Sequence, residues 1–186
     1  FIVTHLGDNN EYAGAVVPPV FLNSLHVFPS IDAYYATDPL DRQKYVYGRS
    51  GNPTVRLVEQ KVAALEHGEA ALCFASGMAA ASGAVMACCK SGGHVICVRN
   101  AYGPLKQFLT VYCAQHLNLE TTFVEGSRVE EFEQSIRPNT QLIILESPSS
   151  IVFSLQDIRA VTALAKANGI RTYIDNTFCS PLFRMI

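Results

Sequence analysis

The run Leu142-Ile143-Ile144-Leu145 decides the fold class of this chain. Its aliphatic residues do not alternate with polar ones, which is typical of a strand that is buried on both faces of a sheet. Short apolar runs of the same kind recur along the chain at residues 70–75, 94–98, 121–124 and 172–174. Because segments with helical spacing separate these runs, the sequence predicts an α/β fold with a mainly parallel sheet and helices on both faces.

The segments between the runs carry signals for helix starts. Asn52 can cap a helix, Ser127 with Glu130 forms a capping box, and Ser154 with Asp157 opens a further helix. In a parallel sheet the carboxyl ends of the strands lie along one edge, which is where ligands bind in open α/β folds. Residues that follow the apolar runs are therefore the first candidates for a site.

Composition restricts the classes of function. The chain has 186 residues, of which 49% are hydrophobic and 16% charged, which suits one domain of ordinary size. The formal net charge of -2 offers no basic field to nucleic acid. No stretch approaches the ~20 uninterrupted apolar residues that span a membrane, and residues 1–8 lack the pattern of a signal peptide. We therefore expect a cytoplasmic protein that binds neither nucleic acid nor membrane.

The cysteines predict free thiols instead of disulfides or metal ligands. None forms a C-x-x-C pair and most lie in apolar runs, so we expect buried thiols in a reducing cytoplasm. The five histidines are scattered without metal-ligand spacing, and no metal site is predicted. The six cysteines are Cys73, Cys88, Cys89, Cys97, Cys113 and Cys179.

Ser76-Gly77-Met78 follows the run at residues 70–75 and opens a helix. Backbone N–H groups at a helix start point outward at the positive end of the helix dipole, so a phosphate can bind there without a side-chain charge. The alternative interpretation is an ordinary turn of small residues that lets helix and strand pack closely. The absence of G-x-G-x-x-G and of a Walker-type glycine–lysine sequence disfavours dinucleotides and nucleoside triphosphates.

Asp175 ends the apolar run at residues 172–174 and places a carboxylate at the carboxyl edge of the sheet. A partly buried carboxylate needs a cationic partner or several donors. The protonated ring nitrogen of a pyridine cofactor is one such partner, and the salt bridge would make the ring an electron sink. A helix-capping or loop aspartate is the alternative interpretation.

Three further residues could contact a cofactor. Tyr102, in the loop after the run at residues 94–98, could stack on a flat ring or deliver a proton, or could simply anchor a surface. Tyr47 and Arg49 pair a phenol with a guanidinium, whose forked donors match a phosphate. Such a pair is also common on plain surfaces.

Six motifs run in a specific order over essentially the whole chain: Gly14-Ala15-Val16-Val17-Pro18-Pro19, Tyr47-Gly48-Arg49-Ser50-Gly51-Asn52-Pro53-Thr54, Ala75-Ser76-Gly77-Met78-Ala79-Ala80, Ala101-Tyr102-Gly103, Glu146-Ser147-Pro148 and Asp175-Asn176-Thr177-Phe178. In this order they resemble the Cys/Met-metabolism pyridoxal-phosphate (PLP) enzymes, whose fold is aspartate-aminotransferase-like (fold type I). The resemblance implies PLP as cofactor and a small sulfur amino acid as substrate.

The resemblance also implies a role for each matching position. Gly77 and Met78 would offer backbone donors to the cofactor phosphate. Asp175 would hold the ring nitrogen, with Thr177 close by. Tyr102 would stack on the pyridine ring and take part in proton transfer, which makes it the catalytic candidate of this chain.

Other implied roles concern a second copy of the chain. Tyr47 and Arg49 would reach the phosphate of a neighbouring subunit's cofactor, so the enzyme is expected to be a homo-oligomer, a dimer of dimers, with shared sites. Residues 1–53 would form an extended arm onto that partner, and residues 54–186 part of the PLP-binding large domain. The family's Schiff-base lysine is expected beyond Ile186, so these residues alone should not catalyse.

Two departures from the family pattern suggest the reaction. Pro104 stands where many members have a second glycine and methionine γ-lyases have cysteine, and Ser150, a cofactor-binding position, stands where many have asparagine. Both resemble cystathionine β-lyases, which implies cleavage of L-cystathionine to homocysteine, pyruvate and ammonia. The alternatives are a γ-type member (cystathionine γ-synthase or γ-lyase, methionine γ-lyase, or O-acylhomoserine sulfhydrylase) and a non-catalytic phosphate-ligand or regulatory module of the same fold.

Overall fold

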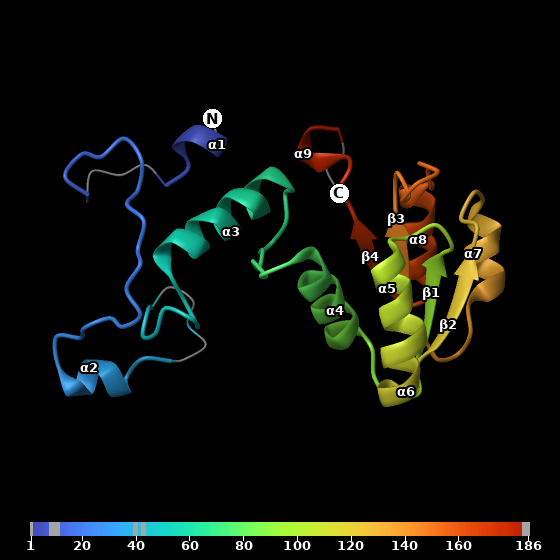
Figure 1. Ribbon diagram of the computed structural model, residues 1–186, viewed down its shortest axis with the longest axis horizontal. Coiled ribbons are helices and arrows are strands. Elements are labelled where there is room, and N and C mark those ends of the chain that lie inside the picture. Colours follow the sequence, from blue (N-terminus) through green and yellow to red (C-terminus); the bar gives the residue numbers. More distant parts are fainter. Residues whose placement is uncertain (1, 8–11, 39–40, 42–43, 184–186) are drawn as a thin grey trace. The chain divides into compact units, whose positions relative to one another are not determined.

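The computed structural model describes residues 2–7, 12–38, 41 and 44–183. It divides into two compact units, with the boundary after Cys73. Figure 1 labels the elements of both units.

The first unit holds short helices and extended chain. Its helices are α1 (Ile2–His5), α2 (Ile31–Tyr35) and α3 (Pro53–Leu65). Asn52 caps α3 as predicted, because its side chain accepts a hydrogen bond from the N–H of Thr54 at 2.8 Å. Among the described residues of this unit only Glu59 is buried, and it accepts from the N–H of Cys73 at 3.0 Å. The unit therefore has little apolar core of its own.

The second unit, from Phe74 onward, is built on a four-stranded sheet in which every strand is parallel to its neighbours. The strand order is β2-β1-β3-β4. The strands are β1 (His94–Val98), β2 (Glu120–Val124), β3 (Thr140–Glu146) and β4 (Arg171–Asp175). All of β1 and residues 142–146 of β3 are buried, as expected for central strands covered on both faces. The α/β prediction with a parallel sheet is confirmed.

Helices cover both faces of this sheet (Figure 1). On one face α7 (Val129–Ser135) contacts β2, α8 (Ile158–Ala167) contacts β4, and the two helices contact each other. On the other face α4 (Gly77–Cys88) contacts β3, β4 and α5. The segment of α5 (Gly103–Gln107), the π-helical η1 (Phe108–Cys113) and α6 (Ala114–Leu117) is continuous, and α9 (Ser180–Phe183) follows the sheet.

One predicted strand is wrong. Residues 70–75 form no strand, and no described strand pairs with them. A strand needs a neighbour to bond its backbone, whereas here the N–H of Cys73 donates to the side chain of Glu59. Leu72 and Phe74 are exposed instead of buried.

Two predicted helix starts are shifted. The capping box of α7 uses Glu131, which accepts from the Ser127 hydroxyl at 2.8 Å, and not Glu130, which is exposed. Asp157 alone caps α8 by accepting from the N–H of Ala160 at 2.9 Å. Ser154 pairs instead with the hydroxyl of Ser149 at 2.7 Å. In both cases the helix begins later in the sequence than the pattern indicated.

All six cysteines are free, as predicted, but their burial differs. Cys89, Cys97 and Cys113 are buried, and burial raises the pKa of the Cys97 thiol to about 12. Cys73 is exposed because it lies outside any strand. No helix in the described part of the chain is long and apolar enough to cross a membrane.

Candidate functional site

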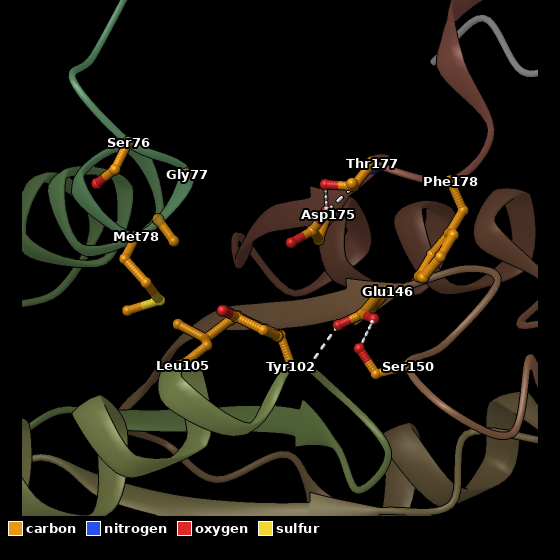
Figure 2. Close-up of a pocket in the computed structure, with 11 residues that line it drawn as sticks. Ser76, Gly77, Met78, Tyr102, Leu105, Glu146, Ser150, Asp175, Thr177 and Phe178 are labelled. Carbon is orange, nitrogen blue, oxygen red and sulfur yellow. Dashed lines mark hydrogen bonds between the residues drawn. The ribbon is translucent and has the colours of Figure 1, made fainter.

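The carboxyl ends of β3 and β4, the loop after β1 and the start of α4 surround a pocket of about 510 Å³ in the second unit (Figure 2). Pockets of roughly 300–1,000 Å³ hold small molecules. The strand order reverses direction beside β1, so this pocket lies at the topological switch point where open α/β sheets bind ligands. Its lining residues are Ser76, Gly77, Met78, Ala81, Tyr102, Leu105, Glu146, Ser150, Asp175, Thr177 and Phe178.

Asp175 is the last residue of β4, and its carboxylate is held from one side only. Both the backbone N–H, at 3.0 Å, and the hydroxyl of Thr177 donate to Oδ1. No described residue donates to Oδ2. A carboxylate with one oxygen fixed and the other open can accept a charge-assisted bond from a protonated nitrogen of a ligand.

Glu146 is a pocket residue for which the sequence motifs predicted no role. It ends β3, is 2% exposed, and is the register partner of Asp175. Its Oε2 accepts from the N–H of Tyr102 at 2.6 Å, and its Oε1 accepts from the hydroxyl of Ser150 at 2.5 Å (Figure 2). The signal that identified Asp175, an acid directly after an apolar strand, also applies to Glu146.

The N-terminus of α4 supplies backbone donors to the pocket. Ser76 is the N-cap, and its hydroxyl accepts from the N–H of Ala79 at 3.1 Å. The N–H groups of Gly77 and Met78 have no acceptor among the described residues. A Cβ added at Gly77 would meet nothing within 4 Å, so the approach to these donors is open. An anion fits such a helix start.

Tyr102 links the two sides of the pocket. It precedes α5, its N–H donates to Glu146, and the residue is 47% exposed. In Figure 2 the start of α4 lies on one side of the pocket, while Asp175 and Glu146 lie on the other. The apolar side chains of Leu105 and Phe178 also line the pocket.

The charges of the pocket are separated. Among the described residues no lysine or arginine lines it, whereas two carboxylates do. Burial, together with the negative charges of Asp175 and Glu146, raises the pKa of Tyr173 to about 12, which agrees with a negative potential at these strand ends. The start of α4 carries the positive end of its dipole. The pocket therefore suits a ligand with a cationic nitrogen and an anionic group.

Tyr47 and Arg49 belong to the first unit, so the pocket is lined by six of the eight predicted binding residues. The Arg49 guanidinium lies 5.0 Å from the centre of the Tyr47 ring. Between them, a Cβ at Gly48 would come within 2.7 Å of the Asn23 carbonyl oxygen, so glycine is required there.

Comparison with known proteins identifies the family. The model of the family described as Cys/Met metabolism PLP-dependent enzyme matches residues 2–185. The chain belongs to this family. Its cofactor, in the family's own description, is PLP.

Relatives in the Cys/Met family are named for different activities. The chain is 37% identical over 178 residues to L-methionine gamma-lyase of Porphyromonas gingivalis, covering 95% of this chain and 44% of the relative. It is 42% identical over 139 residues to cystathionine beta-lyase MetC of Staphylococcus haemolyticus, covering 75% of this chain and 35% of the relative. The chain thus spans less than half the length of these relatives.

A solved structure supports the fold. The chain matches the crystal structure of metY of Campylobacter jejuni with a TM-score of 0.88 and 26% sequence identity. The match covers 97% of this chain and 44% of the metY chain. That crystal structure contains N'-pyridoxyl-lysine-5'-monophosphate. The expected fold class, with helices around a parallel sheet, is therefore confirmed as that of a PLP-dependent enzyme.

The residues of the pocket fit PLP. The open oxygen of Asp175 matches a protonated pyridine nitrogen, and the open N–H groups of Gly77 and Met78 match a phosphate. The ring of Tyr102 offers a flat, apolar face beside them. These donors and acceptors have no other partners in the described part of the chain.

Proposed function

We propose that the full-length protein is a PLP-dependent carbon–sulfur lyase that, with water, cleaves L-cystathionine to homocysteine, pyruvate and ammonia. The observation that carries the proposal is a single pocket with the carboxylate of Asp175 at one end and the open N-terminus of α4 at the other. The second candidate is γ-elimination from a sulfur amino acid, because a relative named L-methionine gamma-lyase is also similar.

The cofactor, when bound, supplies a protonated pyridine ring that accepts the electron pair left after the substrate loses its α-proton. Asp175 keeps the ring nitrogen protonated through Oδ2, and Thr177 holds Oδ1 so that the carboxylate cannot rotate away. Gly77 and Met78 bind the phosphate with backbone N–H groups. Tyr102 lies against the ring, and its phenol oxygen moves a proton to or from the substrate.

A second copy of the chain completes the site in this proposal. Arg49, with Tyr47 beside it, binds the phosphate of the cofactor in that copy. Residues 1–53 act as the arm that reaches it, and residues 54–186 as part of the cofactor-binding domain. The support is exposed apolar surface on the arm, where Val27 is 99% exposed and gains from being covered. We propose a dimer of dimers located in the cytoplasm.

Two residues favour β-elimination over γ-elimination. A γ-elimination removes a proton from Cα and then a second proton from Cβ, so a base must serve two positions. A β-elimination expels the thiolate directly after the proton has left Cα. Ser150 offers a shorter side chain than asparagine, and its hydroxyl is bound to Glu146. Pro104 lacks a backbone N–H and stiffens the start of the helix after Tyr102. Both features suit the simpler reaction.

Identification of the keto acid tests the proposal. The full-length protein is purified, loaded with PLP and incubated with L-cystathionine, and the released keto acid is identified by chromatography. We expect pyruvate. If 2-oxobutanoate predominates, the β-lyase proposal is wrong and the γ-type alternative is supported. A protein that shows the cofactor's visible absorption band but releases neither keto acid would be a binding module.

A further inference from the structure

Ser150 lines the pocket, and its hydroxyl proton is donated within the chain. The hydroxyl donates to Glu146 Oε1 at 2.5 Å. The other oxygen of Glu146 accepts from a backbone N–H, that of Tyr102, which can only donate. An ionised carboxylate only accepts, so both bonds have a fixed direction.

The loop around Ser150 holds the hydroxyl in this position. The N–H of Ser149 donates to the Ser154 carbonyl at 2.9 Å, and the N–H of Phe153 donates back to the Ser149 carbonyl at 3.0 Å. Within this closed loop Ile151 has a φ of 67°, which is strained for a β-branched residue. Such strain persists only where the surrounding contacts determine the backbone, so Ser150 is held rigidly.

We propose that Glu146 is the positioning residue of this pocket: it ties the Tyr102 loop to Ser150 and takes the Ser150 proton, so that Ser150 presents only lone pairs to the ligand. The inference rests on the proposed function, since it concerns the residues around the cofactor. It implies that Ser150 donates no hydrogen bond to the cofactor or the substrate. Ser150 therefore does not replace the N–H donor of an asparagine at this position.

Glu146→Gln reverses the direction of the bond. The glutamine oxygen still accepts from Tyr102, while its NH2 group donates to the Ser150 oxygen and releases the hydroxyl proton into the pocket. The substitution also removes one negative charge. The double variant Glu146→Gln/Ser150→Ala keeps the loss of charge but lacks the Ser150 hydroxyl proton. A double-mutant cycle therefore separates the effect of the charge from the effect of the released proton.

The cycle is measured on the full-length protein with two readouts. In the PLP-loaded protein, the pH titration of the visible absorption band is recorded. We expect Ser150→Ala to leave its midpoint nearly unchanged when Glu146 is present, and to shift it by about one unit in the Glu146→Gln background. In the cofactor-free protein, we expect Ser150→Ala to lower Tm more when Glu146 is present, because a buried carboxylate then loses its donor.

Controls keep each outcome decisive. Ser149→Ala, in the same loop but paired with Ser154, should lower Tm without moving the titration in either background. Equal titration shifts by Ser150→Ala in both backgrounds would overturn the inference. If Glu146→Gln does not fold, Ser150→Ala and Ser150→Thr test the inference instead. A large titration shift with an unchanged Tm in Ser150→Ala would overturn the inference. A Tm for Ser150→Thr close to that of the unmodified protein would support it. Absence of any visible absorption band in the unmodified protein would instead refute the proposed function. The Tm values of the cofactor-free variants would then still test the hydrogen bond between Ser150 and Glu146.

Discussion

Glu146 and Asp175 are register partners at the ends of β3 and β4, yet their carboxylates are satisfied differently. Both oxygens of Glu146 accept hydrogen bonds from the chain, whereas only Oδ1 of Asp175 does. Two neighbouring acids repel each other unless a cation lies between or beside them. The open oxygen of Asp175 is therefore the place at which we propose that a cationic nitrogen binds.

Asp175→Ala should remove activity without unfolding the full-length protein. Loss of the partner of the pyridine nitrogen should lower kcat with L-cystathionine by about 10²-fold or more. The matched control is Asp157→Ala, which removes the cap of α8 and should lower the free energy of unfolding by about 1 kcal/mol while kcat is kept. Near-normal turnover of Asp175→Ala would contradict the assignment.

Hybrid oligomers should reveal a shared site. Arg49→Ala protein and a variant without the Schiff-base lysine should each be inactive. After subunit exchange, some sites combine an intact Arg49 from one chain with an intact lysine from the other, so part of the activity should return. Exchange is verified by mass spectrometry of differently tagged chains, and verified exchange with no recovery would count against sharing.

His94 should make the protein less stable in acid. Its ring nitrogens pair with the hydroxyls of Thr140 and Thr122, each at 2.8 Å. Burial lowers the pKa of His94 from its ordinary 6.5, and the Arg137 guanidinium lowers it further, against an opposite effect of Glu120. The unfolded chain therefore binds the proton first. Stability is complete above pH 6.5 and falls as the pH drops from there towards the lower folded-state pKa.

Urea unfolding at several pH values measures this loss. The free energy of unfolding should decline as the pH falls below about 6.5, and a His94→Asn variant should show a flatter dependence because its side chain does not titrate. Parallel curves for both proteins would show that other groups cause the decline.

Glu131→Ala should destabilise the second unit, whereas Glu130→Ala should not. Hydrogen bonds from the Gly126 N–H and the Ser127 hydroxyl lower the pKa of Glu131, so its ionised form is bound in the fold. We expect a loss of about 1 kcal/mol for Glu131→Ala, and a change within about 0.5 kcal/mol for the exposed Glu130. Chemical denaturation at neutral pH compares them. The effect of Glu131→Ala should disappear below the lowered pKa, where the wild-type carboxyl is protonated.

Local pattern was sufficient for most of the sheet and part of the site. The runs at residues 94–98, 121–124, 142–145 and 172–174 became strands because a parallel sheet covered by helices buries both faces of an unbroken apolar segment. The run at residues 70–75 has the same composition but no strand beside it. Composition does not specify a partner, and a strand without one does not form.

The sequence by itself determined the α/β class, the family motifs and the position of Asp175 at a strand end, since each depends on residues that are close in the chain. Only the tertiary structure decided that Glu146 joins Tyr102 to Ser150, because the first of these bonds closes a separation of 44 residues. It also decided that Ser150 gives its proton to the chain. The direction of a hydrogen bond depends on which donors surround an acceptor in space, and that follows from the packing of β1 against β3.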